Sequence, residues 1–202
     1  MNLQMKQAFI FFLSVLALST TLWAGGFLDK KVVKLGEAVP DFKLVDTSGK
    51  ERQLSQYRGK IVTLHFWSAT CPFVMRYEER LQEITDDYSG RGVVILGIDS
   101  NVDETPEQIK KVAEKRKVNC PILIDTSSRV ANQFGAITTP HVFIIDKEGK
   151  LIYEGAVDDQ GWSEDNPVKI RYVREALEAH LSGIPVPNTQ TKTVGCTIKR
   201  AF

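Results

Sequence analysis

Cys71 is the residue of this sequence best placed to do chemistry, because it stands between a strand pattern and a helix pattern. Residues 61–67 are mostly β-branched or aromatic with almost no charge, which predicts a central strand buried on both faces. After Pro72, apolar residues recur every three to four positions, which predicts an amphipathic helix. Unpaired N–H groups and the positive end of the helix dipole at such a junction favour the thiolate, the form of a cysteine that attacks electrophiles. We therefore expect Cys71 to be a nucleophile, with Arg76 and Arg80 adding positive potential.

The cysteine count limits what the thiols can do together. The chain has three cysteines, Cys71, Cys120 and Cys196, so at most one internal disulfide can form. At least one thiol is then free, bound to a metal or joined to another molecule. Cys120 precedes Pro121 and a predicted core strand, where a small buried apolar residue is the simpler interpretation. Cys196 lies in an apolar segment near the end of a polar tail, which we expect to be held against the protein.

The N-terminal residues have the layout of a secretory signal peptide. Lys6 precedes an apolar run over residues 8–18, and a small, polar stretch leads to Ala24. The apolar run is about half of the ~20 residues that a membrane-spanning helix needs. We expect residues 1–24 to be a signal peptide cleaved near Ala24, a periplasmic or secreted protein, and no stable membrane span after cleavage. An uncleaved anchor is the alternative.

Composition favours one soluble globular domain. The 202 residues are 43% hydrophobic and 25% charged, a balance that fits a single well-filled core. Because 26 basic residues nearly cancel 25 acidic ones, no basic field is present to bind nucleic acid. We expect no nucleic-acid partner.

Strand and helix patterns alternate along the rest of the chain, which predicts α/β or α+β layering with a central mixed sheet covered by helices. A strand-turn-strand start precedes the strand at 61–67 and forms an N-terminal β-hairpin. Further strands are expected at residues 93–98, 122–124, 142–145 and 151–156, and helices at 72–89, 105–117, 127–134 and 168–181. We expect one domain over residues 35–182 and a C-terminal extension, residues 183–202, that carries Cys196.

Several short motifs occur in an order that is more specific than any one of them. They are Val39-Pro40-Asp41-Phe42, then Phe66-Trp67-Ser68-Ala69-Thr70-Cys71-Pro72-Phe73, then Thr138-Thr139-Pro140 with residues 142–146 and Gly149. In this order they resemble thioredoxin-like proteins, particularly secreted bacterial redoxins of the AhpC/TSA and TlpA/ResA type. Residues 155–159 and 194–198 resemble a peroxiredoxin-like subgroup with a C-terminal Gly-Cys element. The resemblance implies a thioredoxin-like fold, a redox-active cysteine and no cofactor.

The sequence departs from this family pattern beside Cys71. Val74 stands where thioredoxins carry a second cysteine, and Ser68 stands where some related redoxins carry one, so no disulfide can form at the helix start. Ser68 agrees with the Thr or Ser that peroxiredoxins place three residues before their cysteine, whereas Leu64 replaces their proline. An oxidised Cys71 therefore needs a remote resolving thiol. Cys196 is the preferred candidate and Cys120 the alternative, since bridging requires Cα atoms within about 7 Å.

The resemblance also implies roles for residues around Cys71. Pro140 resembles the loop proline that lies beside the nucleophile, and with Thr139 it would position substrate. Trp67 and Phe73 would form the walls of the site. His141, next to the proline, is expected to be structural, because a single histidine without a spaced partner is weak evidence for a metal.

Three functions fit these residues. The first is exchange between thiols and disulfides of proteins or small molecules, with Cys71 attacking and Cys196 or an external thiol resolving. The second is a thiol peroxidase, an antioxidant enzyme, with Ser68 and Arg76 orienting a peroxide. The third is a binding module that holds copper(I) through Cys71, Met75 and His141, or a catalytically silent adaptor. We expect the first, with no cofactor or metal and with a separate redox partner for re-reduction.

Overall fold

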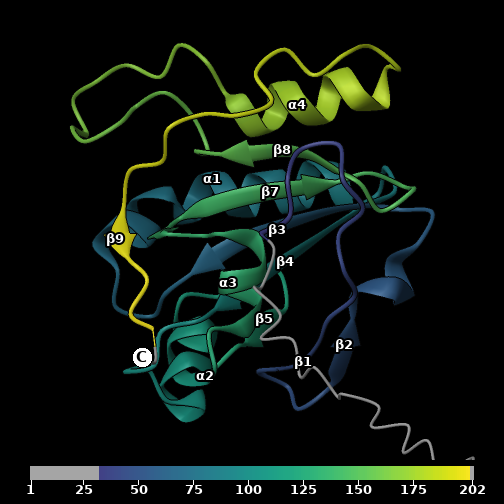
Figure 1. The fold of residues 1–202 in the computed structure, drawn as a ribbon. Helices are drawn as coiled ribbons and strands as arrows, with labels where there is room; N and C mark the ends of the chain where they lie inside the picture. The colour runs from purple at the N-terminus through teal and green to yellow at the C-terminus, as the bar shows by residue number, and fades with distance from the viewer. Residues whose placement is uncertain (1–31, 201–202) are drawn as a thin grey trace, which may run out of the picture.

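A seven-stranded mixed sheet forms the centre of the protein (Figure 1). The computed structural model describes residues 32–200. The strands lie in the order β2-β1-β5-β4-β3-β7-β8. Their bounds are Lys43–Asp46 for β1, Glu51–Gln53 for β2, Ile61–Trp67 for β3, Val93–Asp99 for β4, Ile122–Ile124 for β5, His141–Ile145 for β7 and Leu151–Gly155 for β8. The expected central mixed sheet and the N-terminal β-hairpin, β1 with β2, are confirmed.

The centre of the sheet is the parallel pair of β3 and β4. All seven residues of β3 are buried, as its apolar composition predicted. Strand β4 runs beside it in a register that pairs Ile61 with Val93 and Trp67 with Asp99. Because the strands are parallel, their carboxyl ends meet at one edge of the sheet. The loops that follow Trp67 and Asp99 are therefore neighbours.

Helices cover both faces of the sheet. They are α1 at Pro72–Ser89, α2 at Pro106–Lys115, α3 at Arg129–Phe134 and α4 at Tyr172–Leu181, with a short 3-10 helix at Leu54–Tyr57. Apolar residues of α1 and α4 pack on one face, and those of α3 pack on the other. Ile109 of α2 joins Val74 of α1, Trp67 and Cys71 in a third apolar cluster. This cluster lies beneath the start of α1.

The C-terminal segment returns from α4 to the start of α1 and ends near α2 (Figure 1). There β9, Cys196–Thr197, pairs antiparallel with β6, Thr138–Thr139, and forms a separate two-stranded sheet. The side chain of Ile198 is buried in the main core, and its N–H donates to the Ile137 carbonyl at 3.0 Å. The expectation that the tail is held against the protein is confirmed.

Three of the predicted helices begin or end at other residues than expected. Helix α4 begins at Tyr172 and not at residue 168, because the Asp159 carboxylate accepts from the Lys169 and Ile170 amides and holds them in a loop. Helix α3 begins two residues later than expected, where Asp125 accepts from its first amides. Helix α2 ends at Lys115, ahead of Lys117 with its positive φ of 54°.

Among residues 32–200, no helix combines the length and apolar character needed to cross a membrane. The predicted signal peptide, residues 1–24, lies outside the described residues.

Burial of His65 in β3 predicts a loss of stability in acid. Desolvation lowers the pKa of His65 to about 4, so the folded protein keeps this ring neutral while the unfolded chain takes up a proton near its ordinary value of 6.5. Stability from this residue is therefore present above the unfolded pKa and is lost as the pH falls from about 6.5 to 4. Between about pH 7 and pH 5, wild type should lose about 2 kcal/mol more unfolding free energy than His65→Phe, measured by urea unfolding. Equal losses in the two proteins would contradict this assignment.

Candidate active site

Cys71 occupies the N-cap position of α1, as the sequence predicted. Its backbone is extended, with φ −75° and ψ 120°, and its carbonyl accepts the first helical hydrogen bond from Met75 N–H at 3.2 Å. The side chain is only 2% exposed. The Sγ donates to the Thr139 carbonyl at 3.2 Å, which ties the start of α1 to the strand β6 across the site.

Thr139 precedes Pro140 in a cis peptide bond. Opposite Thr139 in the β6–β9 pair lies Cys196, so the same residue that receives the Cys71 thiol faces the tail cysteine. The approach of the tail depends on Gly195, because a Cβ at that position would lie 2.2 Å from the Thr139 oxygen. No side chain larger than hydrogen can be accommodated there without moving the strand.

Cys196 and Cys71 are interacting neighbours in this arrangement. Both belong to the apolar cluster that also holds Trp67 and Val74. Burial raises the pKa of Cys196 to about 11, with further contributions from hydrogen bonding and charge interaction with Cys71. The Cys196 thiol therefore keeps its proton at neutral pH.

Cys120 lies in a different environment. Its Sγ lies 3.5 Å from Nε2 of His65, a residue of the central strand β3, and not beside β6. Burial raises its pKa to about 12. Cys120 is half-buried against the apolar core, so the expected packing role is seen but full burial is not.

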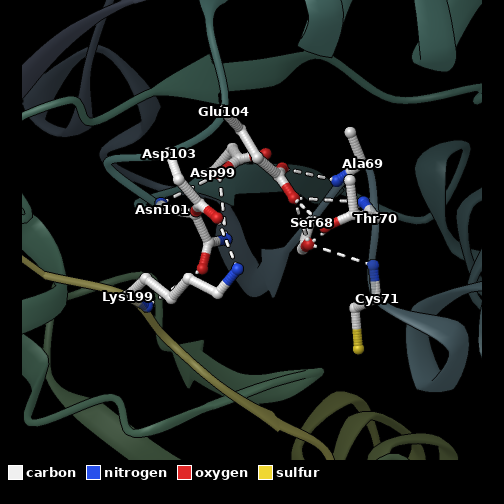
Figure 2. A network of polar contacts seen from close by, with 9 residues as sticks. All are labelled: Ser68, Ala69, Thr70, Cys71, Asp99, Asn101, Asp103, Glu104 and Lys199. Carbon is white, nitrogen blue, oxygen red and sulfur yellow. Dashed lines mark hydrogen bonds and ion pairs between the residues drawn. The ribbon is translucent and has the colours of Figure 1, made fainter.

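The loop before Cys71 rests on one buried carboxylate, Glu104, which no sequence motif had pointed to (Figure 2). Ser68 Oγ donates to Glu104 Oε1 at 2.7 Å, and Ala69 N–H donates to Oε2 at 2.7 Å. Thr70 donates to Oε1 twice, from N–H at 3.1 Å and from Oγ1 at 2.5 Å. Ser68 Oγ in turn accepts from Cys71 N–H at 3.1 Å and from Thr70 N–H at 3.2 Å. The hydroxyl of Ser68 has thus used its one proton and both lone pairs.

Asp99, at the carboxyl end of β4, is a second buried carboxyl group that interacts with Glu104. Burial and the neighbouring Glu104 raise the pKa of Asp99 to about 9. Burial alone would raise the pKa of Glu104, but hydrogen bonds from Asp99 and from the Cys71 loop outweigh it and lower the pKa to about 2. The proton therefore resides on Asp99. Its Oδ2 is buried and has no hydrogen-bond partner among the described residues.

The same network continues to the tail (Figure 2). Asn101 donates to Asp99 Oδ1 from its N–H at 3.0 Å and from Nδ2 at 3.1 Å. Asn101 Oδ1 accepts from Lys199 N–H at 3.1 Å, and the Lys199 carbonyl accepts from Val102 N–H at 2.9 Å. Glu104 N–H also donates to the Asn101 carbonyl at 3.3 Å, so the loop that follows β4 contacts both the Cys71 loop and the tail that carries Cys196.

The rim of the site is formed by α1 and the loop after β8. The two terminal nitrogens of Arg76 donate to the carbonyls of Trp162 and Gly161, at 3.0 and 2.5 Å. The Phe73 ring meets the Trp162 ring edge-on at 5.3 Å, and Trp162 is 68% exposed. Arg76, expected beside a peroxide, is here committed to holding this loop against α1.

Two residues near Cys71 are buried packing residues. Trp67, expected as a wall of the site, is 1% exposed and packs in the apolar cluster with Cys71, so it forms that wall from the inside and offers no surface to a substrate. The ring of His141 lies 4.3 Å from that of Phe143, and burial lowers the pKa of His141 to about 4. Within the described part of the chain, no three His, Cys, Asp or Glu side chains are grouped so that they could hold a metal ion.

The sequence held one signal for the missed carboxylates. Asp99 directly follows a buried run that was predicted to be a strand, and parallel strands bring their carboxyl ends together. Glu104 gave no such signal, because its partners lie 34 to 36 residues earlier on another loop.

The fold and the site define a thioredoxin-fold redox protein with a cysteine at the start of a helix and a second thiol on a C-terminal strand. Residues 35–154 match the model of the AhpC/TSA family, and the chain belongs to that family. It is 38% identical to the thiol-disulfide oxidoreductase ResA of Geobacillus thermodenitrificans over 70% of this chain and 80% of that protein.

Solved structures agree with this assignment. A hypothetical protein from Sinorhizobium meliloti 1021 superposes with a TM-score of 0.77 at 32% identity, covering 85% of this chain and 97% of that one. An uncharacterized conserved protein from Geobacillus kaustophilus gives a TM-score of 0.78 at 32% identity, covering 85% and 94%. The expected thioredoxin-like fold is confirmed, and the protein is a thiol-dependent oxidoreductase.

Replacing Gly195 should detach the tail from Cys71. In Gly195→Ala, the new Cβ cannot lie 2.2 Å from the Thr139 oxygen, so β9 must separate from β6. We expect iodoacetamide to modify Cys71 of the reduced variant at least about tenfold faster than in wild type, followed by peptide mass mapping.

Gly90→Ala is the matched control, because Gly90 has an ordinary φ of −73° and a Cβ placed there would have no neighbouring atom within 4 Å. It should leave the modification rate of Cys71 unchanged. Equal rates in Gly195→Ala and wild type would show that the tail does not shield Cys71.

Proposed function

We propose that the protein is a thiol-disulfide oxidoreductase that cycles between two reduced thiols and a Cys71–Cys196 disulfide. The observation that carries this proposal is the position of Cys196 opposite Thr139, whose carbonyl accepts from the Cys71 thiol. The local partner that thioredoxins use is absent, since Val74 takes that position. Cys120 is engaged with His65 and is the weaker candidate.

The exchange reaction has two steps in this proposal. Cys71, as thiolate, attacks one sulfur of an external disulfide, forms a mixed disulfide and releases the other sulfur as a thiolate. Cys196 then loses its proton and attacks Cys71 Sγ, which forms the internal disulfide and releases the second external thiolate. Two electrons pass from the protein to the external disulfide. Two external thiols reduce the internal disulfide, return two electrons to the protein and restore both of its thiols.

The resolving thiol must lose its proton before it attacks. Burial is the largest cause of the raised pKa of Cys196, and interaction with Cys71 adds to it. Resolution therefore requires removal of the Cys196 proton as its sulfur approaches Cys71.

Access to the sulfurs differs. Cys71 is 2% exposed beneath the tail, whereas Cys196 is half-buried. A reducing thiol therefore reaches the oxidised protein at Cys196, with Cys71 as the leaving thiolate. Attack by Cys71 on a bulky disulfide requires β9 to separate from β6.

The peroxidase alternative has less support. A peroxide bound at Cys71 needs a hydroxyl donor, and the Ser68 hydroxyl already donates to Glu104. Arg76 is hydrogen-bonded to the loop carbonyls of Gly161 and Trp162. An antioxidant role on peroxides would require both side chains to change partners.

Oxidation of the purified protein should produce a Cys71–Cys196 disulfide. We expect non-reducing peptide mapping after treatment with oxidised glutathione to join the peptides of these two residues, because they are neighbours across β6. Cys71→Ser should abolish both the bridge and turnover of a disulfide substrate. Cys120→Ser is the matched control and should retain both. A bridge between Cys71 and Cys120 would contradict the proposal.

We further propose that the protein is exported and acts in the periplasm or outside the cell. The support is the signal-peptide layout of residues 1–24, and an oxidising compartment suits a protein that works through a disulfide. Expression of the full chain in a Gram-negative host should give a mature periplasmic protein whose N-terminus lies close after Ala24. A protein found in the cytoplasm with Met1 intact would contradict export.

A further inference from the structure

Glu104 is a buried group that the proposed exchange reaction does not use. Its carboxylate is 4% exposed, yet it accepts four hydrogen bonds from the three residues that precede Cys71. A buried carboxylate is costly unless its oxygens are fully hydrogen-bonded. The cost is met here by donors of the Cys71 loop, so the position of that loop is set by Glu104.

The other end of the network reaches the second thiol. Glu104 N–H donates to the Asn101 carbonyl at 3.3 Å. The Asn101 side chain donates to Asp99 Oδ1 at 3.1 Å and accepts from Lys199 N–H at 3.1 Å. Lys199 follows Cys196 by three residues in the same segment. The hydrogen bond between Val102 N–H and the Lys199 carbonyl fixes this segment from the same loop. Figure 2 shows Ser68 and Cys71 on one side of Glu104 and Lys199 on the other.

We propose that Glu104 is a positioning residue for the pair of thiols: it fixes the loop that carries Cys71 and, through Asp99 and Asn101, the strand that carries Cys196. This inference rests on the proposed Cys71–Cys196 exchange. It implies that each thiol has a high effective concentration at the other, because one buried network fixes both the loop before Cys71 and the tail segment after Cys196.

The charged groups around the network are already paired. Lys199 Nζ forms an ion pair with Asp103 on the outer side of the loop. Arg116, at the end of α2, donates to the Ala69 carbonyl and forms an ion pair with Glu78. Asp125, after β5, accepts from Ser100 and from the first amides of α3. None of these described contacts replaces the hydrogen bonds that Glu104 accepts from the Cys71 loop.

Two isosteric substitutions separate positioning from a general loss of stability. In Glu104→Gln, an NH₂ group must face at least one N–H donor of the loop, because both carboxylate oxygens accept. In Asp99→Asn, the new NH₂ can donate to Glu104 as the Asp99 proton does, and Oδ1 still accepts from Asn101. Glu104→Gln should therefore break the network, and Asp99→Asn should preserve it.

The measurement is the equilibrium of the reduced protein with oxidised glutathione, in which the protein gains one internal disulfide and two glutathiones are released. Acid quenching and peptide mass mapping give the fraction with the Cys71–Cys196 bridge. We expect Glu104→Gln to lower the equilibrium constant by about tenfold or more and Asp99→Asn to stay within about twofold of wild type. Asp46→Asn, which removes a buried carboxylate of β1 that accepts from Ser48, Lys50 and Arg52, should lower thermal stability but leave the constant unchanged.

The outcomes separate a positioning role of Glu104 from a general loss of stability. A wild-type constant in Glu104→Gln, or an equal fall in Asp46→Asn, overturns the positioning role. An equal fall in Asp99→Asn overturns the shared proton and with it the link to the tail.

If Glu104→Gln does not fold, Asn101→Ala interrupts the network at the tail end alone, and it should lower the constant by about threefold or more. Absence of the bridge in wild type would overturn the proposed function itself, which is a separate result from any of these.

Discussion

The main chain of Thr139 is the point on which the rest of the site depends. Its carbonyl accepts from the Cys71 thiol at 3.2 Å, and the tail strand with Cys196 pairs with it on the other side. This close approach is possible because Gly195 has no side chain to collide with the carbonyl. The tail in turn is held by Ile198, whose side chain is part of the main core. A C-terminal extension thus becomes a wall of the site without enlarging the sheet.

The second constraint is electrostatic. A carboxylate buried beside the active loop is stable only with donors around it, and Glu104 obtains them from residues 68–70 and from the proton of Asp99. The parallel pairing of β3 with β4 brings these groups together, since it places Trp67 beside Asp99. The helix start that carries Cys71 is therefore supported by a carboxylate that is only 4% exposed.

These two constraints determine how a second thiol is brought to Cys71. Cys71 has no neighbour on its own helix to form a bridge with, so its partner must come from a distant segment whose position is built by strand pairing and by a hydrogen-bond network. Because that segment also covers Cys71, the resolving thiol that we propose and the shield are one element. In the proposed cycle, movement of the tail strand governs both the access of substrates and the resolution of a mixed disulfide.

The sequence by itself determined the layered α/β fold, the burial of β3 and the place of Cys71 at the start of α1, because periodicity and chain-breaking residues act over a few neighbours. It also indicated Cys196 over Cys120 without deciding between them. Only the tertiary structure paired Cys196 with Thr139, occupied the hydroxyl of Ser68 and brought Glu104 beneath the loop. It also began α4 at Tyr172, where Asp159 holds the preceding amides. Each of these depends on contacts between residues far apart in the chain, and local patterns carry no information on which distant atoms will meet.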